Sequence, residues 1–195
     1  MIRYRRAPLL MIAVLVTLQA CGTAPSRYYR LDSAATAMGA QALPATVMVG
    51  PVSVPAAVDR PEFVLTDGPN RVEVEEFDRW AAPLDDSIAR AVAGDLSVLL
   101  ATPNVATAPL ADFKPDYNVA INVQRFESDK GNAALVDAVW AVSSAAGKTR
   151  SGRTVARETV QGEGFDALAA AHSRAIAQLS SDIAAAIRAE AAPNI

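Results

Sequence analysis

The sequence contains few of the side chains on which enzyme chemistry depends. Its 195 residues include one cysteine and one histidine. A disulfide within the chain would need a second cysteine, and a zinc site would need several clustered ligands, so neither is expected. The GxSxG signature of serine hydrolases and the HExxH signature of zinc peptidases are absent, as are glycine-rich phosphate-binding loops. The composition therefore disfavours the common enzyme and metalloprotein classes.

Basic residues are scarce after the first few positions. The chain has 18 lysines and arginines against 21 aspartates and glutamates, a net charge of −3. Residues 1–20 contribute three of those arginines and no acidic residue, so the remainder is more acidic than the whole. No basic stripe is left that could follow a phosphate backbone, which argues against a nucleic-acid-binding protein.

The single histidine is the only candidate base for a serine-type catalytic triad. His172 lies four residues after Leu168 and four before Ile176, on the apolar stripe of a predicted helix. A lone histidine in that position is more often a packed core residue than a base. We therefore interpret His172 as part of the core.

Acidic residues gather in one short stretch, at Glu73, Glu75, Glu76 and Asp78. A pair of carboxylates can hydrolyse a glycosidic bond. Glu73 and Glu75, however, alternate with valines, which is the pattern of a strand with one solvated face. A hydrolase with an acid pair is therefore a less favoured alternative, and we expect no catalytic residue.

The N-terminus has the pattern of a secretory signal. Arg3, Arg5 and Arg6 precede an apolar run over residues 8–18. That run is about a dozen residues long, whereas a membrane-spanning helix needs roughly 20. We therefore expect this segment to be cleaved.

The run ends in Leu18-Gln19-Ala20-Cys21, which resembles the lipobox of bacterial lipoproteins. The resemblance implies cleavage of residues 1–20 and attachment of diacylglycerol and an acyl chain such as palmitate to Cys21. Two or more acyl chains anchor a protein stably. By the sorting rule of such lipoproteins, Gly22 in place of aspartate implies the outer membrane of a Gram-negative bacterium, with the protein facing the periplasm.

Periodicity predicts a single α+β domain over residues 46–190, preceded by a tether over residues 21–45 and followed by a tail over residues 191–195. Alternating and β-branched runs predict three groups of strands. Residues 45–55 form a strand with a bulge at Gly50-Pro51, and residues 62–77 form a hairpin around Asp67-Gly68. Residues 117–164 form a three-stranded meander. Apolar stripes at helical spacing predict helices over residues 83–100 and 166–188. The order strands–helix–strands–helix indicates one mostly antiparallel sheet packed against two helices.

Four segments together resemble the PqiC/YmbA-type lipoproteins, the auxiliary lipoprotein component of ABC-type and MCE-type transport systems. They are YYRL (28–31), VGPVSVPAAVDRP (49–61), EFDRWAAPL (76–84) and AHSRAIAQLSSDIA (171–184). Their order and spacing, together with the lipobox, carry the resemblance. Ala56-Ala57 departs from the larger residue that family members often have there.

The resemblance implies a non-enzymatic adaptor without a cofactor. Such lipoproteins dock onto a PqiB-like MCE-domain protein that reaches across the periplasm, with ABC transporter subunits as indirect partners. The system is implicated in lipid traffic between the membranes and in envelope integrity. A homo-oligomeric ring is implied for at least some members.

The motif match suggests a partner-binding surface formed by Asp59, Arg60, Arg79 and Trp80. Tryptophan and arginine are favoured anchors at interfaces. Trp80 could instead plug the corner between a strand and a helix, with Arg79 bonding an acid or carbonyl oxygens. A lipid carrier is a further alternative, which would need an apolar cavity between sheet and helices.

Overall fold

The computed structural model describes residues 25–37, 39 and 41–192. The predicted signal segment and Cys21 lie outside this part. None of the helices in the described ranges is long and apolar enough to cross a membrane.

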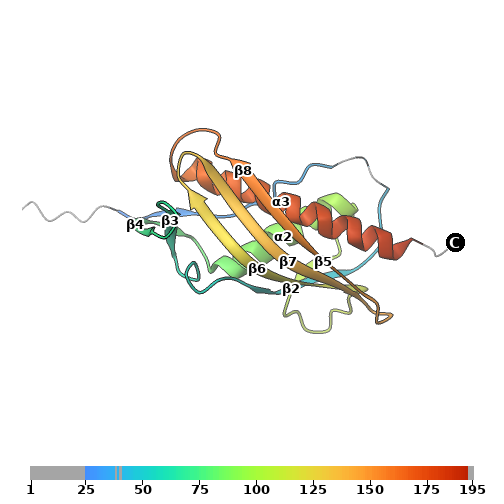
Figure 1. The fold of residues 1–195 in the computed structure, drawn as a ribbon. Coiled ribbons are helices and arrows are strands. Elements are labelled where there is room, and N and C mark those ends of the chain that lie inside the picture. The colour runs from blue at the N-terminus through green and yellow to red at the C-terminus, as the bar shows by residue number, and fades with distance from the viewer. Residues whose placement is uncertain (1–24, 38, 40, 193–195) are drawn as a thin grey trace, which may run out of the picture.

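In the described residues, eight strands form one curved sheet, and two helices cover one of its faces (Figure 1). The elements are β1 (Arg27–Tyr29), β2 (Val47–Ser53), β3 (Glu62–Thr66), β4 (Val72–Trp80), α2 (Leu84–Leu100), β5 (Val105–Thr107), β6 (Tyr117–Asp129), β7 (Ala133–Ser144), β8 (Thr149–Thr159) and α3 (Gly164–Ala191). The α+β class and the order strands–helix–strands–helix are confirmed.

The sheet is built around β6. On one side β6, β7 and β8 form the predicted antiparallel meander, which has the longest pairings in the sheet. The other edge of β6 is divided between two strands: β2 pairs with its first half, and β3 meets it at Ser128, both in parallel. The predicted hairpin of β3 and β4 extends from there, and short parallel pairs add β5 and β1 at the edges. The sheet is therefore mixed.

The bulge predicted at Gly50-Pro51 is present, because the pairing of β2 with β6 shifts between Val49 and Val52. Gly50 has a φ of 128°, a conformation open to glycine and rarely to other residues. A Cβ there would lie 3.0 Å from the Cβ of Ala108. The positive φ and the tight contact therefore both disfavour a side chain at position 50.

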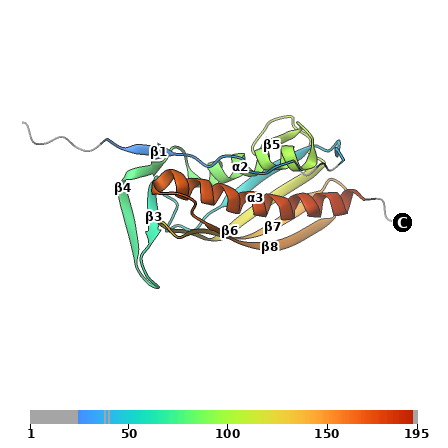
Figure 2. The same ribbon diagram turned by 90° about the horizontal axis from the view of Figure 1, so that it is seen from above.

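The two helices lie side by side and run in the same direction. The side chain of Ser180 on α3 bonds Asp95 in the middle of α2, and Arg188 near the end of α3 bonds the carbonyl of Leu99 near the end of α2. Their buried faces follow the predicted stripes, with Ile88 and Leu96 among the residues on α2 that have no solvent contact. Both helices thus begin at the end of the molecule that carries β1, and the C-terminus lies at the other end (Figure 2).

His172 lies in the core, as its helical spacing predicts. Its Nε2 is 2.8 Å from the hydroxyl oxygen of Ser128, and its ring stacks on Phe126 with the ring centroids 4.0 Å apart. Burial lowers the pKa of His172 to about 3.

We therefore expect the imidazole of His172 to stay neutral in the folded protein at pH 5. The unfolded chain takes up this proton near pH 6.5, so the free energy of unfolding should fall as pH drops below that value, by up to about 1.4 kcal/mol per pH unit. Because the chain has one histidine, its NMR signal needs no assignment. The urea-unfolded protein is the control, and a midpoint near 6.5 in the folded protein would contradict the expectation.

Candidate functional site

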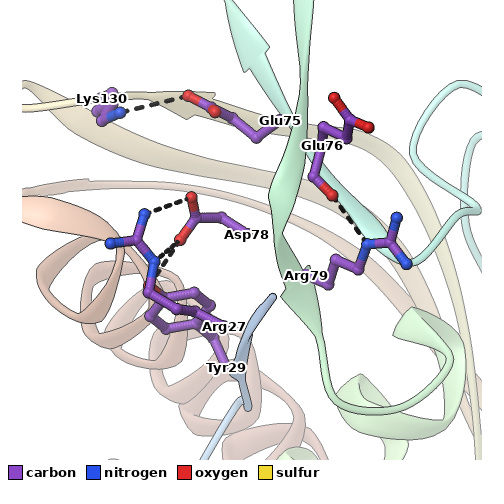
Figure 3. Close-up of polar contacts among 7 residues, drawn as sticks. All are labelled: Arg27, Tyr29, Glu75, Glu76, Asp78, Arg79 and Lys130. Atoms are coloured by element: carbon purple, nitrogen blue, oxygen red, sulfur yellow. Dashed lines mark hydrogen bonds and ion pairs between the residues drawn. The ribbon is translucent and has the colours of Figure 1, made fainter. Parts of the chain in front are cut away.

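The candidate site is organised by β4, whose pairing with β3 jumps at its end. Phe63 pairs with Glu75, but the preceding residue of β3, Glu62, pairs with Arg79. The extra residues form a bulge, which bends the strand and redirects its side chains. Asp78 and Arg79 follow one another in the strand and point to opposite sides of β4 (Figure 3).

On one side of β4, Asp78 holds β1 in place. Asp78 is 2% exposed, and its carboxylate accepts two hydrogen bonds of 2.8 Å from the guanidinium of Arg27 and one of 2.7 Å from the hydroxyl of Tyr29. Burial by itself raises the pKa of Asp78, but these hydrogen bonds outweigh it, and the net pKa lies below its usual value. Asp78 is therefore an anionic anchor for the strand that opens the domain.

A second buried carboxylate holds the residues that follow β1. Asp95 accepts hydrogen bonds from the hydroxyl of Ser33 (2.7 Å) and from the amides of Ala34 and Ala35 (2.9 Å each). A Cβ on Gly94 would lie 2.9 Å from that of Ser33, so the close crossing needs glycine there. We call residues 27–35, fixed by these two carboxylates, the strap.

The predicted tether is, in its described part, bound to the domain rather than separate from it. Beyond the strap, the amide of Leu43 donates to the carbonyl of Leu100 at 2.9 Å, and Arg188 donates to the carbonyl of Gln41. The domain boundary at residue 46 remains a prediction, but packing against the helices begins well before it. Asp95, the one acid in the apolar second half of the predicted helix, is the feature of the sequence that could have indicated this contact.

A cleft of about 350 Å³ lies at the start of α2. Asp59, Arg60 and Trp80 line it together with Pro61 and the first residues around α2. We call this the β4 cleft. The structure thus brings together three of the four residues that the sequence suggested for partner binding.

Arg79 joins this group through Glu62. The carboxylate of Glu62 accepts from Arg60 at 3.2 Å and lies 3.4 Å from Nη2 of Arg79. Hydrogen bonds from its own backbone and from Arg60 lower the pKa of Glu62. Arg79 also donates to the carbonyl of Glu76 at 3.0 Å. Two guanidinium groups are therefore held at fixed positions beside the cleft.

Trp80 fills the corner between strand and helix. It is 4% exposed and stacks on Phe63 with the ring centroids 4.0 Å apart, with Phe126 and His172 around it. Only part of the side chain reaches the cleft. Because replacing a buried tryptophan by alanine costs about 3–5 kcal/mol, Trp80→Ala would test stability more than binding.

Two of the four clustered acids are engaged in other contacts. Glu75 binds Lys130 at 3.3 Å, and Asp78 is occupied by the strap (Figure 3). The lowered pKa of Asp78 keeps it ionised at neutral pH, so it lacks the proton that a glycosidase acid must donate. No group of three or more His, Cys, Asp or Glu side chains suited to a metal ion occurs in the described part of the chain.

The described residues form a small α+β domain, with its first segment strapped across two helices. The chain belongs to the family of ABC-type transport auxiliary lipoprotein components, whose model matches residues 29–184. The resemblance noted in the sequence is thereby confirmed.

Solved structures support the fold. An uncharacterised protein is 21% identical with a TM-score of 0.69, covering 84% of this chain and 99% of its own. A protein from Xanthomonas campestris is 21% identical with a TM-score of 0.67, covering 81% of this chain and 92% of its own. No curated protein matches the chain.

Tyr29 offers a direct test of the strap. Burial, followed by the hydrogen bond to Asp78, raises the pKa of Tyr29 to about 12. We expect the absorbance titration of the folded protein to contain a phenol with that midpoint, which Tyr29→Phe removes. Since the folded pKa lies above the unfolded value of about 10, the contribution of this phenol to stability is complete below pH 10 and is lost as pH rises toward 12.

Tyr28→Phe is the matched control, because the neighbouring Tyr28 is largely exposed. It should leave the late-titrating phenol in place. Burial also raises the pKa of Tyr117, which is present in both variants. A high-pH titration of Tyr29→Phe identical to that of the unmodified protein would show that the hydroxyl of Tyr29 is not bound as described.

Proposed function

We propose that this chain is a lipoprotein anchored through Cys21 in the outer membrane of a Gram-negative bacterium and facing the periplasm. In this proposal it is a non-enzymatic adaptor subunit of an MCE-type intermembrane lipid transport system that supports envelope integrity. Membership of the transport auxiliary family and the lipobox at residues 18–21 support it.

The observation that carries the adaptor role is the β4 cleft. Apolar surface from Pro61, Pro83 and the edge of Trp80 lies beside the guanidinium of Arg60. Arg60 uses its Nε for Glu62, and an arginine has further N–H donors to offer an acidic group. The cleft is thus suited to a partner segment that combines an apolar side chain with a carboxylate.

The interior of the domain favours an adaptor over a lipid carrier. The space between the sheet and the helices is filled by side chains without solvent contact, among them Val47, Ile88, Leu96, Leu179 and Ile183. A cavity of about 550 Å³ lies instead at the surface between the strap and α3, and charged residues such as Asp32 and Arg174 line it. Acyl chains need an apolar pocket, which neither place provides.

Charge reversal at the cleft tests the adaptor role. We expect Arg60→Glu, in the lipidated protein at native expression, to recover far less MCE-domain protein during purification in mild detergent. Placing two like charges opposite each other at an interface costs several kcal/mol, so the recovery of the partner should fall about tenfold or more. The measurement is quantitative mass spectrometry of the co-purified proteins.

Arg157→Glu is the matched control, since Arg157 is an exposed arginine on β8 whose side chain pairs only weakly, at 3.9 Å, with Asp129. It should leave the recovery unchanged. Equal recovery with Arg60→Glu and with the unmodified chain would remove the cleft from the interface, and recovery of no transport component at all would argue against the adaptor role.

A further inference from the structure

The lipid anchor is tied to one end of the molecule by a short length of chain. β1 begins at Arg27, six positions after Cys21. Since an extended residue spans at most about 3.6 Å, the Cα atom of Cys21 stays within about 22 Å of that of Arg27. By comparison, the 28 residues of α3 make a helix about 42 Å long. The anchor therefore cannot reach the far end of the domain.

The strap keeps β1 on the sheet, so the length of free chain between Cys21 and the domain cannot increase. Peeling β1 from the sheet would break both hydrogen bonds between Arg27 and Asp78 and the bond from Tyr29. The buried Asp78 would then be left as an uncompensated charge, which is strongly unfavourable. Residues 22–26, which we call the leash, therefore join Cys21 to a fixed point at Arg27.

The end that carries β1 also carries a protruding hairpin with an apolar face. In both views the β3–β4 hairpin projects at this end, opposite the C-terminus (Figures 1 and 2). Val72 and Val74 share one face of β4 and are 60% and 41% exposed, beside Val64 on β3. Val64 itself is only 9% exposed, so we call Val72 and Val74 the hairpin face. Tyr28, on β1 at the same end, is exposed as well.

We propose that the hairpin face and Tyr28 rest on the lipid surface, so that the domain stands on the membrane at its β1 end. This rests on the proposed lipidation of Cys21. The leash length favours the bilayer as the occupant, because it holds this end of the domain next to the lipids at all times. Tyrosine is suited to such a surface, since its ring enters the apolar layer while its hydroxyl stays in water.

The proposed orientation places the β4 cleft close to the membrane. The cleft lies at the start of α2, at the same end of the molecule as β1 and the hairpin. A partner segment bound there is held next to the bilayer. Lipid that leaves the partner would then reach the membrane without crossing the length of the domain.

Site-specific fluorescence in vesicles tests this orientation. The full lipidated chain carries one added cysteine, as Val72→Cys, Leu110→Cys or Val155→Cys, labelled with an environment-sensitive fluorophore. The three positions are similarly exposed, at 60%, 49% and 58%, but lie on the hairpin, on the loop before β6 and on the outer face of the sheet. Each protein is reconstituted in phosphatidylethanolamine–phosphatidylglycerol vesicles with or without brominated acyl chains, which quench nearby fluorophores.

We expect the fluorophore at position 72 to lose emission in brominated vesicles, and those at 110 and 155 to keep it. Quenching at 155 would mean that the outer face of the sheet lies on the membrane. Quenching at 110 would mean that the opposite end of the domain contacts the membrane. Either result overturns the proposal. Absence of quenching at all three positions overturns it too. So does a concentration-dependent emission shift at 72 without quenching, which would place a second copy on the hairpin face.

The lipid anchor is checked in the same preparations. A lipidated Cys21 has no free thiol, so the chain without an added cysteine should take up no label and should float with the vesicles. Labelling of Cys21 would refute lipidation and, with it, the leash. Lack of quenching in a chain whose Cys21 is shown to be lipidated refutes only the orientation.

Discussion

The buried carboxylate of Asp95 is the interaction on which the arrangement of the strap and both helices depends. It sits in the middle of α2 without solvent contact and accepts hydrogen bonds from Ser33, Ala34, Ala35 and Ser180. Removing a carboxylate from water costs several kcal/mol, which is offset only when hydrogen bonds satisfy its oxygens. Since those donors come from the strap and from α3, the charge is stabilised only when all three segments are in place. Docking of the strap and packing of the helices are therefore one cooperative event.

Much of the fold follows from local pattern in the sequence. Alternation over β6, β7 and β8 and the Asp-Gly turn between β3 and β4 predict antiparallel neighbours, because a short turn leaves few other partners within reach. Apolar stripes predict α2 and α3, and Gly50-Pro51 predicts the bulge. The parallel pairings were not predictable in this way. They join Arg27 with Asp78 and Val47 with Tyr117, and no local rule selects a partner at that separation.

The candidate site, too, was predictable from the sequence only in part. Motif match suggested Asp59, Arg60, Arg79 and Trp80, and the structure gathers three of them at the β4 cleft. Residue type alone did not separate an exposed anchor from a corner plug for Trp80. Stacking on Phe63 decides this, and that contact depends on the bulge that offsets β3 from the end of β4. Glu62, which connects the two arginines, lay outside the suggested set because its role exists only in the folded register.

The strand β4 connects the two proposed contacts of the domain. Asp78 binds the strap. The next residue, Arg79, contacts Glu62, which also binds Arg60 of the cleft. Behind both, Trp80 and its aromatic neighbours form a close-packed support that restricts movement of the strand. A binding site held in one conformation loses little entropy when its partner arrives. In the proposed arrangement, the distance from the lipid surface to the bound partner is therefore set by a few residues at the end of β4. A mobile linker between anchor and domain would let that distance vary. The short leash, and the buried carboxylates of Asp78 and Asp95 that hold the strap, both keep the distance constant.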